Sequence, residues 1–376
     1  MRIKRSYRFI SFLLSIILAI SYCSFAFAQT GDQSNQTDPA NANSGYSETS
    51  YTSEMLTNNY TLASSRYQTG MYAGDRIEIP INTAFTGGSG SELTSENFKY
   101  KNDVVALEIG DTAVLSIEAP EAAQYYISFD YYPTSDNVLP IEFSMKLNGE
   151  FPFFEARRFK FKSTWAYKDE VTLDRYGNEI VTMPDKKIQW ENMYLMDASY
   201  RHSEPLAFEL KEGKNELEIK FSEGSMLLGN IYLSGIKETD IPVYQKNQAM
   251  AGDKIITIEA EKMTSSNDSS IRPIAEYDTS LTPYSTSKKV LNVIDSASFN
   301  EAGQTINYTF NVEEAGYYYI AFRYRQPNKT DFPVFCDIKI DGAIPNELLQ
   351  AYPFDYTRSY KNLTLKDRDK EPIAVY

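Results

Sequence analysis

The sequence predicts an all-β protein made of two jelly-roll or β-sandwich modules, the second of them incomplete. Three observations support this prediction. Apolar residues alternate in short runs between turn residues, no long stretch shows helical spacing, and one block of the chain recurs at a constant distance. Many short strands at this spacing are typical of a sandwich or jelly roll.

The chain begins with a pattern typical of export. A basic start is followed by an apolar run and then by the small-residue exit Ala26, Phe27, Ala28. This pattern predicts a signal peptide at residues 1–28, cleaved after Ala28. The apolar run is shorter than the roughly 20 residues that cross a bilayer, so we expect no transmembrane segment after cleavage. Tyr22 is too large for the residue before an acylated cysteine, which argues against lipid anchoring at Cys23.

Charge and cysteine content exclude several classes of protein. The full chain carries a net charge of −14, and removal of the four basic signal residues leaves −18. Nucleic acid is therefore not an expected partner. Cys336 is the only cysteine after processing, so no intrachain disulfide can form.

Composition divides the mature chain into four parts. Residues 29–59 are polar without apolar periodicity, which predicts a disordered tether. Residues 60–237 contain a full series of short strands and predict a complete β-sandwich module. Residues 238–250 are expected to be a linker, and residues 251–376 a second β-sandwich module, C-terminally truncated.

An internal repeat is the strongest signal in the chain. EAAQYYISFDY, which begins at Glu121, recurs as EAGYYYIAFRY at Glu314. LPIEFSMKLNG, which begins at Leu139, recurs as FPVFCDIKIDG at Phe332. Both pairs are 193 residues apart, and a constant offset of this kind indicates a duplicated structural unit.

The same offset predicts where the second copy stops. Asp174 and Arg175 match Asp367 and Arg368, again 193 residues later. The last strands of the first copy, residues 206–233, would then have counterparts beyond Tyr376. We therefore expect the second copy to lack these strands and the chain to be part of a longer polypeptide.

No catalytic pattern stands out. His202 is the only histidine, so neither a histidine-containing triad nor a zinc site of several imidazoles can form. No glycine-rich phosphate loop and no GxSxG elbow occurs. The expected activity is binding and not catalysis.

Aromatic and basic residues interleave in residues 151–168. In a strand, Phe159 and Phe161 would point into the core while the charges face water. Alternatively, Arg157 and Arg158 would contribute to a cationic face for an acidic polymer.

Both tryptophans and one tyrosine lie beside turn-rich segments. Trp165, Tyr167 and Trp190 would either stack on a sugar ring from there or anchor the core. The 29 tyrosines suit a flat polyhydroxylated ligand and suit any exposed sheet equally well.

Two segments of the second copy resemble a known family. IEAEKM from Ile258 and AGQTINYTFNVEEAGYYYIAFRYR from Ala302 resemble carbohydrate-binding modules of families 6 and 35. The resemblance implies a galactose-binding-like jelly roll that binds a polysaccharide or oligosaccharide. It also implies a structural calcium at Glu259 and Glu261, and a sugar contact at Asn230. The first copy has only Glu78 where the calcium pair would lie.

Other segments of the first copy resemble a class of transport receptors. FEARRF from Phe154 and DRYGNEI from Asp174 resemble the N-terminal regions of large extracellular solute-binding proteins of bacterial ABC sugar importers. This resemblance implies a secreted or cell-surface bacterial protein whose partner is a substrate-binding domain in the same longer chain. The alternative is a structural spacer or docking module without a ligand of its own.

Overall fold

The structure is a computed structural model of the chain. The predicted signal peptide with Cys23, and the first part of the predicted tether, lie outside the residues that it describes. The described part from Glu54 to Tyr376 belongs to one compact unit. The described residues are 48–168, 170–235, 241–246, 248, 250–252, 254–327 and 330–376.

Few described residues are helical. Asn59 accepts a hydrogen bond from the Leu62 amide at 3.1 Å and caps the start of the second helix. No helix in the described part of the chain is long and apolar enough to cross a membrane. The helices are α2 (Glu48–Thr57), α3 (Tyr60–Ser64) and α4 (Ile81–Ala84), with 3-10 turns η1 (Phe154–Arg157) and η2 (Glu347–Leu349).

The predicted tether is too long at its C-terminal end. Residues 48–57 form α2, although the sequence predicts disorder through residue 59. Within this helix, the Glu54 carboxylate lies 2.7 Å from the Arg157 guanidinium, which comes from a segment about a hundred residues later. A contact between residues so far apart in the chain leaves no periodic pattern in the nearby sequence. The polar composition of residues 48–57 therefore gave no sign of this helix.

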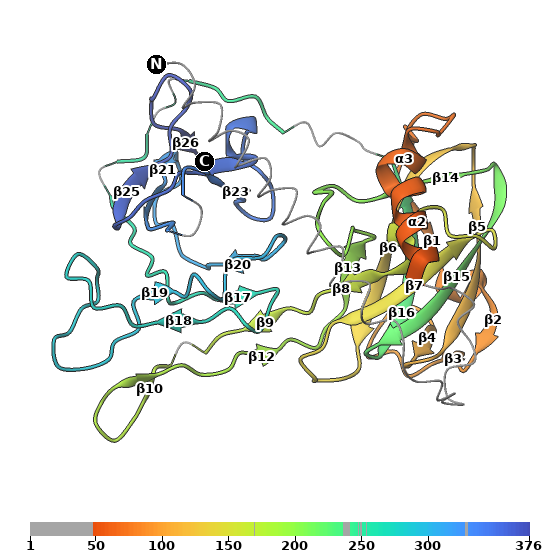
Figure 1. Ribbon diagram of the computed structural model, residues 1–376, viewed down its shortest axis with the longest axis horizontal. Helices are drawn as coiled ribbons and strands as arrows, with labels where there is room; N and C mark the ends of the chain where they lie inside the picture. The colour runs from red at the N-terminus through yellow and green to blue at the C-terminus, as the bar shows by residue number, and fades with distance from the viewer. Residues whose placement is uncertain are drawn as a thin grey trace, which may run out of the picture. The chain divides into compact units, whose positions relative to one another are not determined.

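The first copy contains a seven-stranded antiparallel sheet (Figure 1). Its main path runs β13-β6-β16-β4-β3, while β1 pairs with β16 and β14 pairs with β6. The strands are β1 (Ile77–Ile79), β3 (Glu92–Thr94), β4 (Val104–Leu107), β6 (Ala123–Pro133), β13 (Glu191–Tyr194), β14 (Ala207–Leu210) and β16 (Met226–Ser234).

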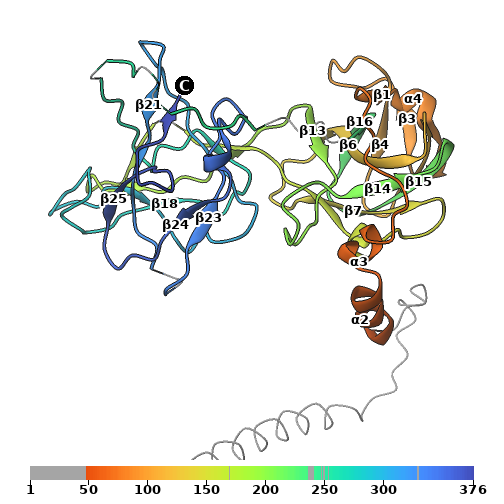
Figure 2. The same cartoon turned by 90° about the horizontal axis from the view of Figure 1, so that it is seen from above.

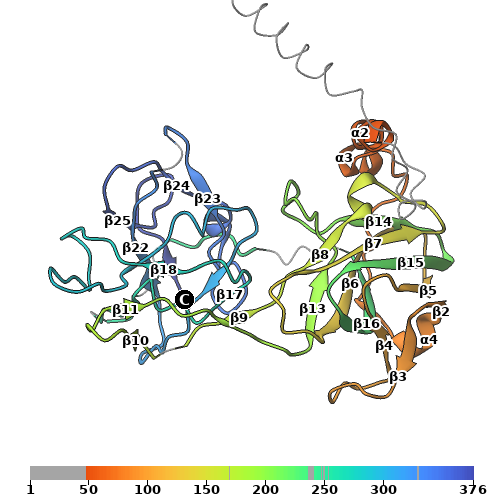
Figure 3. The same ribbon diagram turned by 60° about the horizontal axis from the view of Figure 1, so that its bottom comes forward.

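A five-stranded antiparallel sheet forms the second layer, in the order β2-β5-β15-β7-β8 (Figure 3). Strand β15 lies in its middle, and Leu217 stands opposite both Leu115 and Leu147. The strands are β2 (Phe85–Ser89), β5 (Thr112–Ala119), β7 (Ile141–Leu147), β8 (Phe159–Phe161) and β15 (Gly213–Glu223).

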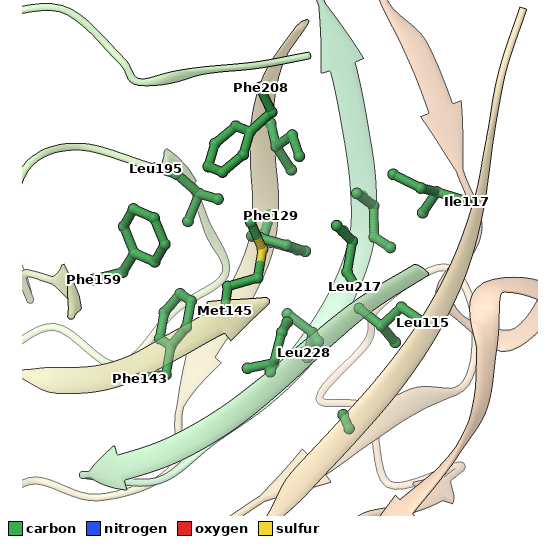
Figure 4. Packing of buried hydrophobic residues seen from close by; sticks show 14 of the residues in the cluster. Leu115, Ile117, Phe129, Phe143, Met145, Phe159, Leu195, Phe208, Leu217 and Leu228 are labelled. Atoms are coloured by element: carbon green, nitrogen blue, oxygen red, sulfur yellow. The ribbon is translucent and has the colours of Figure 1, made fainter. Parts of the chain in front are cut away.

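One hydrophobic core fills the space between these two sheets. Alternate residues of β6, β7 and β15 are buried, as expected for strands with one face on a core. Figure 4 shows Phe129 and Leu228 from one sheet near Met145 and Leu217 from the other. The prediction of an all-β sandwich is thus confirmed for the first copy.

The second copy is built from shorter strand pairs. Its own cluster contains Leu349, Tyr352 and Leu365, and Tyr244 packs against it. Tyr244 lies in the predicted linker 238–250, so part of that segment belongs to a core. The strands are β17 (Ser265–Ser266), β18 (Pro273–Ile274), β19 (Val293–Ile294), β20 (Ile306–Asn307), β21 (Tyr318–Tyr319), β22 (Ala321–Tyr324), β23 (Val334–Cys336), β24 (Tyr352–Phe354), β25 (Lys361–Thr364) and β26 (Ala374–Val375).

The repeat is visible in the backbone of the two copies. Figure 2 shows β23 and β24 side by side, and they pair in the register of β7 and β8. Ile141 faces Phe161 in the first copy, and Val334 faces Phe354 in the second. Asp341 has the left-handed φ of 49° that its counterpart Asn148 has at 51°.

The repeat does not keep its 193-residue offset to the end of the chain. The Leu195 amide donates to Ile127 O at 3.0 Å, and the Leu365 amide donates to Ile320 O at the same distance. Ile320 lies 193 residues after Ile127, whereas Leu365 lies only 170 residues after Leu195. The counterpart of Asp367 is therefore Asp197.

The predicted match of Asp174 with Asp367 is wrong, and local turn chemistry explains the error. Asp174, Asp197 and Asp367 each accept hydrogen bonds from the amides two and four residues further on. Similar turns thus arise at positions that are not equivalent. Between β8 and β13 the first copy instead carries an insertion with β9 (Trp165–Ala166), β10 (Thr172–Leu173), β11 (Glu179–Ile180) and β12 (Asp185–Lys186).

The corrected offset changes which strands the second copy contains. Phe208 of β14 faces Tyr125, and Val375 of β26 faces the equivalent Tyr318. Strand β26 is therefore the counterpart of β14. The sequence predicted that this counterpart would lie beyond Tyr376, because the insertion was counted as part of the repeat.

Replacing Phe143 with alanine is expected to lower the free energy of unfolding by about 3–5 kcal/mol. Its ring is 1% exposed and lies 5.0 Å from the Phe161 ring centre. Urea denaturation followed by circular dichroism measures the change. Val138→Ala serves as the control, since Val138 is 60% exposed. Equal effects of the two substitutions would contradict this description of the core.

Candidate functional site

Side chains on the outer surface of the seven-stranded sheet form a cluster that we name the aromatic face. Phe129 and Tyr131 of β6 are buried, so Asp130 and Tyr132, which alternate with them, point away from the core. Pairing of β6 with β13 places Asn192 opposite Asp130. The face comprises Arg76, Glu78, Phe98, Tyr100, Lys101, Asp130, Tyr132, Trp190, Asn192, Asn230 and Tyr232.

Four rings contact one another along this face, and the Trp190 ring is tilted by 30° to that of Tyr100 and by 46° to that of Tyr132. The Trp190 ring centre lies 4.1 Å from that of Tyr100 and 5.5 Å from that of Tyr132. Phe98 stacks on Tyr132 at 4.6 Å, with an interplanar angle of 10°. Phe98 remains 58% exposed. The stack thus presents an accessible ring surface and is held together by its own contacts.

The loop before β4 holds the outermost ring in place. Phe98 and Lys99 both have left-handed backbone conformations, with φ of 45° and 66°. Bulky residues rarely adopt this conformation unless surrounding contacts impose it. Asn97 supplies such contacts, because its side chain donates to Tyr100 O at 3.0 Å and its carbonyl accepts from Trp190 Nε1 at 3.1 Å.

Asp130 is the polar centre of the face. Its carboxylate accepts hydrogen bonds from the Tyr100 hydroxyl at 2.5 Å, the Tyr232 hydroxyl at 2.8 Å and Asn192 Nδ2 at 2.8 Å. Burial, together with this bond to Asp130, raises the pKa of Tyr100 well above its usual range. Tyr100 therefore stays protonated as a donor, and the three bonds fix the orientation of the rings around the carboxylate.

Basic side chains lie at the edge of the face. The Arg76 guanidinium carbon lies 3.9 Å from the centre of the Tyr232 ring, and the guanidinium donates to Asn192 Oδ1 at 3.0 Å. Lys101 Nζ donates to the Tyr232 hydroxyl at 3.1 Å and forms an ion pair with Glu78. The hydrogen bond from Lys101 holds the pKa of Glu78 below its usual value.

Two residues that the sequence singled out meet at this face, but in different roles. Trp190 belongs to the ring stack. Asn230 is fully buried, and its side-chain Nδ2 donates to Glu78. Its backbone amide donates to the Tyr100 hydroxyl at 2.9 Å. A buried side chain cannot touch a ligand, so Asn230 positions Tyr100 and Glu78 and does not contact sugar itself.

Sequence reasoning missed most of the face. Tyr100, Asp130, Tyr132 and Tyr232 were not predicted as site residues. The signal was present in part, because strict alternation in YYISFDYY assigns Asp130 and Tyr132 to the side opposite Phe129. Nothing in the sequence indicates that a loop about 30 residues earlier reaches the same place.

Trp165 and Tyr167 lie elsewhere and have structural roles. Trp165 is 6% exposed on β9, which pairs with β17 of the second copy. The Tyr167 hydroxyl donates to Ile271 O at 2.6 Å. The predicted sugar contacts at these two residues are therefore not supported by their burial and bonding, and the alternative of core anchoring applies to Trp165.

Arg157 and Arg158 form ion pairs with carboxylates. Arg157 pairs with Glu54, and its guanidinium carbon lies 4.1 Å from the centre of the Phe151 ring. Arg158 makes two hydrogen bonds to Glu142, at 2.8 and 2.5 Å. The following Phe159 is buried in the core. This arrangement matches the core-strand interpretation of the segment better than a cationic face for an acidic polymer.

Glu259 and Glu261 provide only part of a calcium site. Glu261 Oε2 is buried and has no hydrogen-bond partner among the described residues. Calcium takes six to eight oxygen ligands. No group of three or more His, Cys, Asp and Glu side chains in the described ranges could hold a metal ion. These two carboxylates alone do not complete a site, and calcium binding stays a prediction.

Comparisons with known proteins find distant similarities. No family model and no curated protein matches the chain. A family 35 carbohydrate-binding module from Clostridium thermocellum is 13% identical, with a TM-score of 0.29 over 43% of this chain and 100% of that chain. The C-terminal family 6 module of a marine laminarinase from Zobellia galactanivorans is 12% identical, with a TM-score of 0.26 over 43% and 99%. The TM-scores are low, so the fold assignment rests on the strand pairing and burial described above.

Glu261→Gln is expected to raise the melting temperature at pH 7 in the presence of EDTA. Burial raises the pKa of Glu261, and the charge of Glu259 raises it further. A raised pKa in the folded state means that folding favours the protonated carboxyl, so the ionised form becomes costly as the pH rises through the folded-state pKa. The advantage of glutamine should therefore shrink as the pH falls towards 4. Thermal unfolding at several pH values measures it.

Calcium provides the counter-test for the same variant. If Glu261 binds the ion, calcium will raise the melting temperature of the wild type but not that of Glu261→Gln. An absence of any pH-dependent difference between the two proteins in EDTA would contradict the burial of this carboxylate.

Proposed function

We propose that the chain is a non-catalytic carbohydrate-binding protein and that the aromatic face of the first copy is its binding surface. The observation that supports this proposal is the combination of an exposed ring stack with oriented polar groups on one open sheet surface. Aromatic rings offer an apolar surface to the CH groups of a sugar, while hydroxyl and amide groups recognise its hydroxyls.

The face is pre-organised for such a ligand. Asp130 holds Tyr100, Tyr232 and Asn192 in fixed orientations before any ligand arrives. Ordering flexible side chains at an interface costs about 0.5–1.5 kcal/mol for each of them. A ligand that meets this face avoids much of that cost, because the rings and amide already have their partners.

The bonding of the acidic residues favours binding over catalysis. Asp130 accepts hydrogen bonds from three donors, and Glu78 is paired with Lys101. A general acid or base instead needs a pKa near the working pH, whereas the pKa of Glu78 is lowered by Lys101. The single histidine, His202, packs against the Tyr60 ring at 4.9 Å, away from this face.

We further propose that the chain acts outside a bacterial cell, as the N-terminal part of a solute-binding protein of an ABC sugar importer. The signal-peptide pattern and the resemblance of FEARRF and DRYGNEI to such receptors support this context. A spacer role without a ligand has its own support, because β9 of the first copy pairs with β17 of the second.

Trp190→Ala is expected to weaken glycan binding by at least roughly tenfold, since a central aromatic residue commonly contributes 2 kcal/mol or more to binding. Affinity gel electrophoresis against galactan, mannan, xylan and laminarin identifies a ligand, and calorimetry with its oligosaccharides measures the loss. Tyr176→Ala is the matched control, because Tyr176 is 67% exposed on the insertion.

Two results would overturn this proposal. One is the absence of binding to every glycan by the folded wild type, which would leave the spacer role. The other is a Trp190→Ala variant that binds as well as the wild type. Trp165→Ala should lower the melting temperature without a specific loss of affinity, because Trp165 is buried.

A further inference from the structure

The second copy contains counterparts of four strands of the five-stranded sheet. Ser266 of β17 faces Ile306 of β20, as Gly88 of β2 faces Ala113 of β5. Strands β23 and β24 pair in the register of β7 and β8. In the first copy β15 joins these two pairs of strands, because it lies between β5 and β7. In the second copy the two pairs belong to separate sheets, and no strand among the described residues takes the place of β15.

The other layer of the second copy keeps its strand pairing. Strands β22 and β25 pair in the way that β6 and β13 do, so Arg323 takes the place of Asp130, and Asn362 that of Asn192. Asn192 Nδ2 donates to Asp130 Oδ1 at 2.8 Å in the first copy, and Arg323 donates to Asn362 Oδ1 at 2.8 Å in the second. The same two positions are therefore hydrogen-bonded in both copies.

A ring contact between the two layers is also kept. The ring centres of Phe129 and Phe161 lie 6.5 Å apart in the first copy. Their counterparts in the second copy, Phe322 of β22 and Phe354 of β24, lie 5.5 Å apart. The pair β23–β24 thus packs against β22 as the pair β7–β8 packs against β6.

The turn that leads from one layer to the other has the same hydrogen bond in both copies. The Tyr125 hydroxyl donates to Glu121 O at 2.9 Å, between β5 and β6. The Tyr318 hydroxyl donates to Glu314 O at 2.6 Å, between β20 and β22. The segment before this turn, residues 305–312, therefore enters the turn as β5 does. Both neighbours of the missing strand are held by contacts that the first copy shares.

Apolar side chains beside the missing strand are uncovered. Phe310 is 44% exposed and Val312 46%. Their counterparts Ile117 and Ala119 are 0% and 2% exposed, and both pair with residues of β15. Residues 308–312 belong to no strand, and β23 pairs with β24 alone among the described strands. We name residues 308–312 together with β23 the acceptor face.

The first copy shows which apolar side chains fit such a surface. Leu217, Ile219 and Phe221 alternate along β15 and are buried in the core. Figure 4 shows Leu217 beside Leu115 of β5, its partner in the register. Strand β15 runs antiparallel to both of its neighbours. A strand with apolar residues at every second position therefore matches the acceptor face.

An ion pair adds a charge to this pattern. Lys146 Nζ of β7 lies 2.9 Å from Glu218 Oε1 of β15. Lys339 lies 193 residues after Lys146 and is exposed. Opposite charges on facing strands stabilise their pairing, and like charges destabilise it. A strand that carries an acidic residue opposite Lys339 is thus favoured over one that carries a basic residue there.

We propose that the acceptor face binds an extended peptide strand of a partner protein, antiparallel to β20 and β23. The strand has apolar residues at alternate positions and an acidic residue opposite Lys339. Its main chain supplies the hydrogen bonds of the sheet, and its apolar side chains cover Phe310 and Val312. The chain's own β15 does not serve, because it lies in the middle of the first copy's sheet. The inference does not depend on the sugar-binding function proposed for the first copy.

The test measures fluorescence anisotropy of a labelled peptide with the β15 sequence, residues 213–223, titrated with the full chain. Saturable binding is expected, and a scrambled peptide of the same composition should bind at least roughly tenfold more weakly. Phe310→Asp should also weaken binding by at least roughly tenfold, because a carboxylate would be buried among apolar side chains. Asn311→Asp is the matched control, since its side chain points to the opposite face.

A charge exchange tests the register of the bound strand. Lys339→Glu should weaken binding of the β15 peptide by roughly two- to fivefold, the size expected for an exposed ion pair. A peptide with Glu218→Lys should recover the lost affinity on this variant and bind the wild type more weakly. In the wild-type complex, amide hydrogen exchange should slow at residues 308–312. A Glu218→Lys peptide that binds both proteins equally would contradict the proposed register.

Three results would overturn the proposal. They are the absence of binding to the folded wild type, equal affinity for the β15 peptide and its scrambled form, and an unchanged affinity in a folded Phe310→Asp variant. Light scattering should find the free chain to be a monomer. A dimer that Phe310→Asp dissociates would instead assign the acceptor face to a second copy of the chain. Binding that is retained in Trp190→Ala separates this site from the aromatic face.

Discussion

The period-two alternation of β6 is the constraint on which the fold and the candidate site both depend. Successive residues of a strand point to opposite faces of the sheet. Phe129 and Tyr131 therefore fill the core, while Asp130 and Tyr132, which alternate with them, face outward. A one-residue slip of this strand would bury the carboxylate and expose the core rings, so the packing of the sandwich also fixes the position of the site.

The sequence was informative where the signal is local. Alternation and turn residues predicted the all-β class, and repeated blocks predicted that Val334 and Ile141 would hold equivalent places, as the register of their strands shows. It also singled out Trp190 as a candidate sugar contact, and that role stays a prediction. It failed where a contact joins distant segments, because no local pattern records that Trp165 is covered by strand β17 about a hundred residues later.

The error in the repeat has a particular physical origin. An aspartate that accepts hydrogen bonds from two backbone amides makes the same compact turn wherever it occurs. Asp174 and Asp197 both make it, and only one of them can be equivalent to Asp367. Long-range backbone hydrogen bonds, such as that from the Leu365 amide to Ile320 O, show that Asp197 is the equivalent residue. These bonds depend on the strand pairing and not on the turn.

The asparagine opposite β6 has a consequence for how such a surface can change. Asn192 offers its amide NH₂ group to a carboxylate, and Asn362 offers its amide oxygen to a guanidinium. One neutral partner thus accommodates either sign of charge by using the other end of its amide. A single substitution at the facing strand position can reverse the local charge while the asparagine stays hydrogen-bonded. When the facing residue of a duplicated module changes from an acid to an arginine, the asparagine keeps a hydrogen bond. No second mutation is needed at the asparagine itself.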